Sequence, residues 1–557
     1  MPELIHNEVA AIISASLARL GLTEVVISPG SRSAPLSLMF ARQGCFRIQT
    51  VLDERAAAYI ALGKALATRK PVALICTSGT ALLNYAPAIA EAWYQRVPLV
   101  VLSADRPIAW LDQGDGQVVH QAEALRTHLV GYATAPEQLH DDSDRWQLRR
   151  NLSELWQQAV QQRGPVQLNV PLREPLYQLP EPFAPETQAV YHSYRSSGEQ
   201  DIPEALVHDW HRASSIWLLP GAGSADELQQ QAVEALAADP RVLVVAEPLS
   251  NFTPTLAGID ELLRITGTLA LPELIISWGG PWLSKRLKQA LRAHPHTHWR
   301  IDPLGRPHDS SMRLGALWLA HEGEALTALA TLPRGRGDYA RQQQEQAAVV
   351  LERLNQLWAQ LPHSDLAVMR QLLSWLPANT ALHLGNSMPV RYQQFAAYGT
   401  AQRELLHANR GTAGIDGVTS TALGFASCWE GATVLITGEL SFLYDLNAFT
   451  IDTVPPNFKV VVLHNGGGDI FRIIDGPRQQ PELETLFATP RSAQIDKLAE
   501  GWGLGVFEAS DALSLRDAYQ AWQSANQAAV LLVYTDAAAN QQALQLFHHT
   551  LTVAHDQ

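Results

Sequence analysis

Two glycine-flanked turns carry oxygen ligands at a spacing that suits a metal ion and phosphate groups. Glu439 follows the apolar run TVLIT, and Asn465 follows the apolar run VVVLH, 26 residues further along the chain. A carboxylate and an amide oxygen, completed by diphosphate oxygens and water, form the octahedral set that Mg²⁺ demands. Neighbouring glycines let backbone amides approach phosphates closely. The alternative interpretation is two ordinary turns between a strand and a helix.

A third polar residue, Glu54, lies between the apolar run RIQTVL and the helix-forming stretch AAAYIALGKALAT. A carboxylate at this position is often a helix cap. At this position Glu54 fits equally well as a helix cap and as a residue that contacts a ligand.

Basic side chains follow several predicted strands. A single surface arginine is normally a solvated charge or a weak ion pair. The chain has 41 Lys and Arg against 55 Asp and Glu, a formal charge of −14, which argues against a nucleic-acid-binding protein. In this acidic background, basic residues at strand ends indicate recognition of polyanionic substrates. A guanidinium group can donate two parallel hydrogen bonds to one carboxylate. These cations are Arg32, Arg106, Lys285, Arg286, Arg391 and Arg410.

Short apolar strands that alternate with helices must position these residues. Near-continuous apolar strands of this kind predict parallel sheets covered on both faces, and ligands of such sheets bind beyond the carboxyl ends of the strands. We expect an α/β fold with three doubly wound, mostly parallel-sheet domains at residues 1–180, 195–345 and 360–557, with linkers at 179–202 and 332–345. The predicted strands are Glu24–Ser28, Arg47–Leu52, Val72–Thr77, Leu99–Ser103, Ile216–Leu219, Val242–Ala246, Leu274–Trp278, His298–Ile301, Ala381–Leu384, Leu405–Ala408, Thr433–Thr437, Val460–His464 and Val530–Tyr534.

Other classes of protein fit the sequence poorly. The three cysteines are far apart with no CxxC pair, so neither a disulfide framework nor a zinc site is expected. Glu3 and Glu8 lie where a secretory signal would carry positive charge, and no apolar run approaches the roughly 20 residues needed to cross a bilayer. We therefore expect a cytoplasmic protein without membrane insertion.

The Gly438-Glu439 pair followed by Asn465 resembles the fingerprint of thiamine-diphosphate enzymes, a GD pair followed by an asparagine-containing turn. This chain has Glu439 where most members have aspartate, so the metal contact must adjust to a longer side chain. In those enzymes a glutamate at the place of Glu54 hydrogen-bonds the pyrimidine ring of the cofactor and drives activation of its thiazolium carbon. The resemblance assigns that role to Glu54.

The segments SPGSRSAPL, SADRP, GNSMPVR and NRGTAGIDG resemble one branch more closely, the thiamine-dependent synthases of menaquinone biosynthesis. Members join 2-oxoglutarate and isochorismate, with loss of CO₂, into 2-succinyl-5-enolpyruvyl-6-hydroxy-3-cyclohexene-1-carboxylate. The resemblance implies substrate contacts at Arg32, Arg106, Gln117, Lys285, Arg286, Arg391 and Arg410, and catalytic roles for Glu54, Arg32, Gln117, Arg391 and Arg410. It implies cofactor contacts at Glu54, Ser387, Ile415, Gly438, Glu439, Leu440, Ser441 and Asn465, and metal contacts at Glu439, Asn465 and Gly467.

The resemblance also implies thiamine diphosphate with Mg²⁺ or Mn²⁺ and a homodimer or homotetramer, with each cofactor between the first domain of one subunit and the last domain of another. Two alternatives stay open. One is another thiamine carboligase or 2-oxo-acid decarboxylase, such as an acetolactate synthase, which handles smaller substrates. The other is a non-catalytic binding protein that retains the fold, for which the glutamate at position 439 is the best support.

Overall fold

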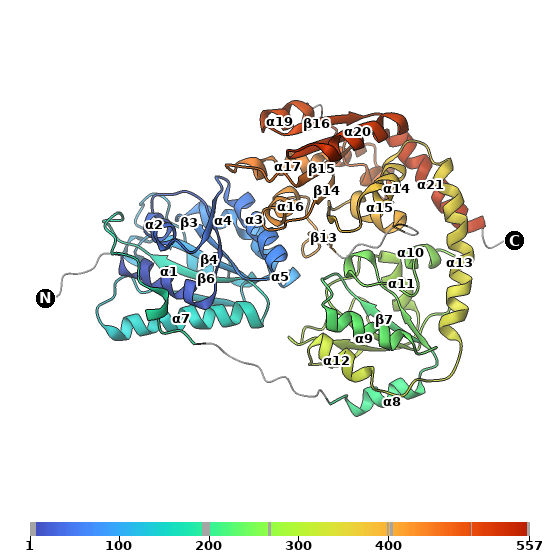
Figure 1. Ribbon diagram of the computed structural model, residues 1–557, viewed down its shortest axis with the longest axis horizontal. Helices are drawn as coiled ribbons and strands as arrows, with labels where there is room; N and C mark the ends of the chain where they lie inside the picture. Colours follow the sequence, from blue (N-terminus) through green and yellow to red (C-terminus); the bar gives the residue numbers. More distant parts are fainter. Residues whose placement is uncertain are drawn as a thin grey trace.

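A computed structural model describes residues 7–191, 201–265, 269–397, 400, 405–491 and 493–553. It contains three sheets, in each of which every strand pair is parallel. We call each sheet with its helices the first, central and third domain; Figure 1 shows them as blue, green and orange-red bodies. The predicted α/β fold class is therefore confirmed. The predicted boundaries at residues 1, 195 and 557 lie outside the described residues.

The first domain has strand order β2-β1-β3-β4-β6-β5. Its strands are β1 (Glu24–Ile27), β2 (Arg47–Thr50), β3 (Val72–Cys76), β4 (Leu99–Asp105), β5 (Gly131–Thr134) and β6 (Val166–Pro171). Its helices are α1 (Glu8–Leu20), α2 (Ala34–Gln43), α3 (Glu54–Thr68), α4 (Thr80–Asn84), α5 (Ala86–Gln95), α6 (Gln121–Ala124) and α7 (Asp142–Gln161).

The third domain repeats this topology, with order β13-β12-β14-β15-β17-β16. Its strands are β12 (Ala381–Leu384), β13 (Leu406–Ala408), β14 (Thr433–Gly438), β15 (Phe458–His464), β16 (Gly505–Ala509) and β17 (Ala529–Tyr534). Its helices are α14 (Asp365–Trp375), α15 (Met388–Ala396), α16 (Val418–Ala426), α17 (Glu439–Tyr444), α18 (Ile470–Ile473), α19 (Ile495–Gly501), α20 (Ala512–Ser524) and α21 (Ala537–Val553).

In both repeats the chain reverses its direction of winding beside the first strand, which is where open parallel sheets bind ligands. In each domain a glycine after the first strand packs against a threonine at the end of the third strand. These are Gly30 after β1 with Thr77 after β3, and Gly385 after β12 with Thr437 of β14. A Cβ on Gly30 would lie 2.3 Å from Thr77 Cβ, and one on Gly385 would lie 2.6 Å from Thr437 Oγ1. The two sheets thus have equivalent edges at the position where open parallel sheets bind ligands.

The central domain has order β11-β10-β9-β7-β8. Its strands are β7 (Ile216–Pro220), β8 (Val242–Val244), β9 (Leu274–Trp278), β10 (Thr297–Ile301) and β11 (Leu314–Trp318), and its helices are α8 (Glu204–Arg212), α9 (Glu227–Ala237), α10 (Ile259–Leu262), α11 (Lys285–Ala293), α12 (Glu322–Leu329) and α13 (Tyr339–Leu357). Part of the predicted linker at 332–345 is wrong, because α13 begins at Tyr339. Glutamine, alanine and arginine favour helix there, and α13 runs beside α21 up to the third domain (Figure 1).

Two of the apolar cores are shared between domains. One contains buried residues of both the first and the third domain, among them Ile60 of α3 and Leu423 of α16. These two helices cross at glycines: a Cβ on Gly63 would lie 1.9 Å from Thr421 O, and one on Gly424 would lie 2.1 Å from Ile60 O. A second core joins the central and third domains. Within the described residues, no helix combines the length and apolarity required to span a bilayer.

Candidate active site

The neighbouring strands β14 and β15 bring Glu439 and Asn465 to one edge of the third sheet. Glu439 is 1% exposed; its Oε2 accepts a hydrogen bond from the Gly466 amide at 3.1 Å and lies 2.9 Å from His464 Nδ1. That contact raises the pKa of His464. Glu439 Oε1 and Asn465 Oδ1 are buried and have no hydrogen-bond partner within the described chain. A divalent cation bound between the two adjacent turns would provide the missing partner for both oxygens.

Asp365, at the start of α14, fixes the orientation of the Asn465 amide. Asn465 Nδ2 donates to Asp365 Oδ2 at 2.7 Å, and Thr535 Oγ1 donates to Asp365 Oδ1 at 2.5 Å. An ionised carboxylate only accepts, so the amide must turn its NH₂ group toward Asp365 and its oxygen away. Asp365 was not predicted from the sequence, because it precedes Asn465 by 100 residues and stands in no recognisable motif.

The adjacent acids Asp53 and Glu54 have separate tasks. Asp53 is the N-cap of α3, since its Oδ1 accepts from the amides of Arg55 at 2.8 Å and Ala56 at 3.3 Å. Glu54 is half-buried and takes part in no ion pair among the described residues. Burial raises the pKa of Glu54, which its own backbone amide partly opposes. The cap interpretation therefore belongs to Asp53, and Glu54 remains available to a ligand.

Asn386 connects the two polar loops that follow β12 and β13. Its Nδ2 donates to Asn409 O at 2.7 Å and to Gly414 O at 2.6 Å, and its Oδ1 accepts from Arg410 Nη1 at 2.8 Å. Arg391, in the first turn of α15, donates to Ser387 O. Both arginines are half-buried, and burial lowers the pKa of each.

The predicted cofactor contacts Ile415 and Ser441 lie together. Ser441 Oγ donates to Ile415 O at 2.7 Å, and the Ile415 side chain remains 39% exposed. Ser387 precedes α15 with a φ of +74°, and Leu440 is half-buried beside Glu439. Gly438 ends β14, and Gly467 has a φ of +126°.

The first domain brings Arg32 and Arg106 to one region. Arg32 is buried, donates to Leu172 O at 2.9 Å and pairs with Glu174 at 3.2 Å. Burial, followed by the charge of Arg106, lowers the pKa of Arg32. Arg106 pairs with Asp115 at 2.9 Å and donates to Gly116 O at 3.1 Å, which holds the exposed loop that carries Gln117.

Lys285 and Arg286 are the first two residues of α11. Arg286 Nε lies 3.8 Å from Asp260 Oδ2, and the Asp260 charge also acts on Arg391 of the third domain. The buried Glu247 accepts from the Ser284 amide at 2.6 Å and from Gln394 of α15 at 3.3 Å. The start of α11 therefore faces α15. Glu247, like Asp365, had no signal in the sequence.

The predicted residues fall into two groups within one chain. Arg32, Glu54, Arg106 and Gln117 belong to the first domain, and the remaining members belong to the third-sheet edge and the facing start of α11. No hydrogen bond or ion pair between described side chains joins Glu54 to Glu439 or Asn465.

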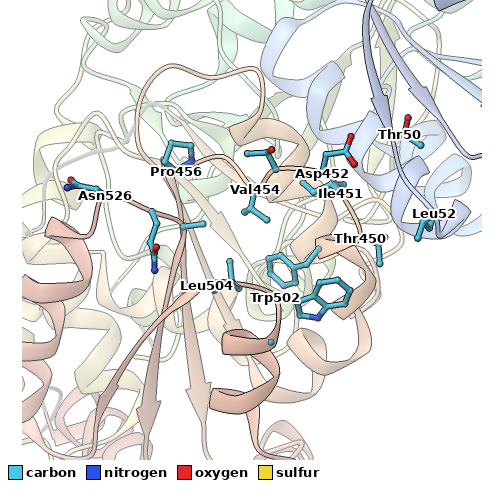
Figure 2. A pocket seen from close by; sticks show the side chains of 16 residues that line it. Thr50, Leu52, Thr450, Ile451, Asp452, Val454, Pro456, Trp502, Leu504 and Asn526 are labelled. Atoms are coloured by element: carbon cyan, nitrogen blue, oxygen red, sulfur yellow. The ribbon is translucent and has the colours of Figure 1, made fainter.

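A cavity of about 810 Å³ between the first and third domains lies apart from this chemistry. Figure 2 shows Thr50 and Leu52 on one side of it and Trp502 and Leu504 on the other. None of the predicted site residues lines it.

Comparison with known proteins matches residues 7–124 to the thiamine pyrophosphate enzyme N-terminal TPP-binding domain and residues 190–384 to the middle domain of thiamine pyrophosphate enzymes. A 2-succinyl-5-enolpyruvyl-6-hydroxy-3-cyclohexene-1-carboxylate synthase from Flavobacterium psychrophilum is 35% identical over 547 residues, covering 96% of each chain. The synthase of the same name from Porphyromonas gingivalis is 36% identical over 534 residues, covering 92% of this chain and 91% of the relative.

The chain belongs to the 2-succinyl-5-enolpyruvyl-6-hydroxy-3-cyclohexene-1-carboxylate synthase family.

As a member of this synthase family it is a thiamine-diphosphate enzyme, which confirms the enzyme class, the family and thiamine diphosphate as predicted from the sequence; the predicted Mg²⁺ or Mn²⁺ stays a prediction. The segment matched to the N-terminal TPP-binding domain contains Arg32, Glu54, Arg106 and Gln117. Lys285 and Arg286 lie in the segment matched to the middle domain. The individual residue roles stay predictions.

Proposed function

We propose that the chain decarboxylates 2-oxoglutarate and adds the remaining four-carbon succinyl unit to the ring of isochorismate. The products are 2-succinyl-5-enolpyruvyl-6-hydroxy-3-cyclohexene-1-carboxylate and CO₂. The observation that carries this proposal is the pair of buried oxygens on Glu439 and Asn465 that have no partner among the described residues, in a chain that is 35% identical to a synthase of that name. Arg391 and Arg410 follow strands of the same sheet. Thiamine diphosphate, when bound, supplies the carbon that attacks the 2-oxo group and the ring that accepts the electrons left by CO₂.

Glu54 holds and returns a proton at the pyrimidine ring of that cofactor. Its half-buried position and raised pKa support this task, because a group that titrates nearer to neutrality is a better proton carrier. Asp53 takes over the capping of α3, which leaves the Glu54 carboxylate unpaired.

The arginines bind the carboxylates of both substrates. Arg32, Arg106 and Arg410 favour the acceptor, and Arg391 favours the 2-oxo acid. Addition to the isochorismate double bond shifts negative charge toward the ring carboxylate, and guanidinium groups already fixed there stabilise that charge. Gln117, Lys285 and Arg286 supply further polar contacts at the rim of the site.

Glu439, Asn465 and the carbonyl of Gly467 would hold Mg²⁺ or Mn²⁺ against the diphosphate. The fit rests on the hard oxygens that lack partners and on the preference of both cations for such ligands. The longer side chain of glutamate leaves Oε1 free while Oε2 is bound by the Gly466 amide.

The active form is a homodimer or a pair of homodimers, with Glu54 and Glu439 of one site supplied by different chains. Within one chain these carboxylates are not joined, and apolar side chains remain open at both edges. Leu52 is 67% exposed beside Glu54, and Tyr444, at the end of α17, is 52% exposed although the Arg55 guanidinium lies 4.7 Å from the centre of its ring. Burial of such side chains favours association.

The test is release of CO₂ from 2-oxoglutarate and from pyruvate, with and without isochorismate, and mass spectrometry of the product. We expect isochorismate-dependent consumption of 2-oxoglutarate. Preferential use of pyruvate would instead indicate an enzyme of the acetolactate synthase kind, and binding of cofactor without turnover would indicate a non-catalytic protein.

A further inference from the structure

Helix α5 of the first domain ends beside the loop of the third domain that carries Arg410. On this helix, Glu91 is fully buried, with 0% of its surface exposed. Its Oε1 accepts from the Gly411 amide at 2.7 Å, and its Oε2 accepts from the Thr412 amide at 2.6 Å and from Thr412 Oγ1 at 2.5 Å. One carboxylate therefore binds three donors of the loop immediately after Arg410.

The contact is too close for other residues to replace the glycine. A Cβ on Gly411 would lie 2.8 Å from Glu91 O and 2.9 Å from Tyr94 Cβ. The backbone of the loop therefore packs directly on α5, and the Glu91 carboxylate satisfies amides that would otherwise be buried without acceptors.

The Arg410 side chain is held from the opposite direction. Its Nη1 donates to Asn386 Oδ1 at 2.8 Å, and no ion pair of Arg410 occurs in the described part of the chain. The Glu91 oxygens are engaged by the loop and by Gln95 Nε2. The guanidinium group thus keeps donors for a substrate carboxylate while its backbone is fixed.

We propose that Glu91 is a positioning residue that holds Arg410 in place for the acceptor substrate. The inference rests on the proposed function, in which Arg410 binds isochorismate. The carboxylate acts through the loop and touches neither substrate nor cofactor. Its removal therefore alters capture of the acceptor and leaves the first half-reaction with 2-oxoglutarate intact.

The test compares wild-type enzyme with Glu91→Gln. The amide retains the shape of the side chain but can accept with only one oxygen, so at least one loop donor loses its partner. We expect the KM for isochorismate to rise about tenfold or more, since a lost hydrogen bond to a charged group has an effect of that size. The KM for 2-oxoglutarate and CO₂ release without isochorismate should stay unchanged. Hydrogen exchange of the Gly411 and Thr412 amides should become faster.

Asp239→Asn is the matched control for general destabilisation. Asp239 is also a buried acid that binds backbone amides, those of Arg241 and Gly335, and in addition it pairs with the Arg241 side chain at 2.9 Å. It lies in the central domain away from these loops, so its loss tests destabilisation at least as large as that of Glu91→Gln. This variant should lower the melting temperature without changing either KM.

Parallel changes in both KM values, or unaltered exchange at Gly411 and Thr412 in Glu91→Gln, would overturn the inference. If wild-type enzyme shows no isochorismate-dependent turnover, the proposed function fails instead. The exchange measurement then decides alone whether Glu91 holds the loop.

Discussion

At the scale of single residues, the adjacent carboxylates of Asp53 and Glu54 differ in how many of their oxygens are already hydrogen-bonded. Both oxygens of Asp53 are used, Oδ1 by the amides of α3 and Oδ2 by Asn447 Nδ2 at 2.6 Å. Glu54 takes part in none of these contacts. Because hydrogen bonding to a carboxylate stabilises its charged form and burial opposes it, the two acids are prepared for different tasks.

Replacement of Glu54 by glutamine removes the proton carrier while it keeps the volume of the side chain. We expect kcat for product formation to fall by about 10²–10⁴-fold, the usual contribution of general acid–base catalysis, with an unchanged melting temperature of the cofactor-free protein. Asp53→Ala serves as the comparison: loss of the cap should reduce stability by about 1 kcal/mol and leave far more activity. Full activity of Glu54→Gln would refute the proposed chemistry.

The hydrogen bond from Asn465 to Asp365 leads to a prediction about metal affinity. Asp365→Asn allows the Asn465 amide to rotate, because the new side chain can both donate and accept. We expect Mn²⁺ binding in the presence of thiamine diphosphate, measured by electron paramagnetic resonance, to weaken about 10–100-fold, as is usual when the partner of a metal ligand is lost. Thr535→Val removes the other hydrogen bond to Asp365 and should have a smaller effect. Equal affinities in all three proteins would contradict this assignment.

The sequence identified the residues that stand in motifs and missed those that support them. Glu54, Arg410 and Asn465 follow predicted strands, so the rule for open parallel sheets found them. Asp365, Glu91 and Glu247 contact the site from helices or strand ends far away along the chain, for example 320 residues between Glu91 and Gly411. A contact between residues so far apart along the chain leaves no pattern in the sequence around either residue.

At the scale of elements, the predicted strands are present with ends shifted by up to two residues, and three of the four missed strands lie at sheet edges. β5, β11 and β16 are edge strands of their sheets and only partly buried, so their sequences lack the continuous apolar run of an interior strand. β6 is interior but contains Gln167 and Asn169, which are buried and bound to Ser103. A strand whose buried polar side chains form hydrogen bonds to the neighbouring strand is not recognised by a search for continuous apolar runs.

The crossing of α3 and α16 makes the site dependent on two helices with almost no space between them. Gly424→Ala would force a Cβ to within 2.1 Å of Ile60 O, so the helices must separate. We expect a loss of about 3 kcal/mol or more, at or beyond the upper end for overpacked cores, measured by urea unfolding. Gly501→Ala is the control, because a Cβ there meets nothing within 4 Å. Equal stabilities of the two variants would show that the crossing is not tightly packed.

At the scale of the whole molecule, the first and third domains share one strand order, and the proposed site residues lie at the equivalent edge of each sheet. In one chain, however, each edge carries half of the proposed site: Glu54 and two arginines on the first, the proposed metal ligands and two further arginines on the third. In a two-fold dimer, the first-sheet edge of each subunit would face the third-sheet edge of the other. This pairing would occur twice, because an isologous interface repeats each contact. The central domain then adds the start of α11 to the third-domain half.

This arrangement predicts complementation between inactive variants. Glu54→Gln and Glu439→Ala should each be inactive alone, because one lacks the proton carrier and the other lacks a metal ligand. If equal amounts exchange subunits freely, half of the dimers are mixed, and each mixed dimer has one intact site and one doubly altered site. About a quarter of wild-type activity should therefore return, measured as isochorismate-dependent CO₂ release after co-refolding. Mixtures of Glu54→Gln with itself, treated in the same way, should remain inactive. Should activity fail to return although mixed dimers are detected by native mass spectrometry, each site must be built within one chain.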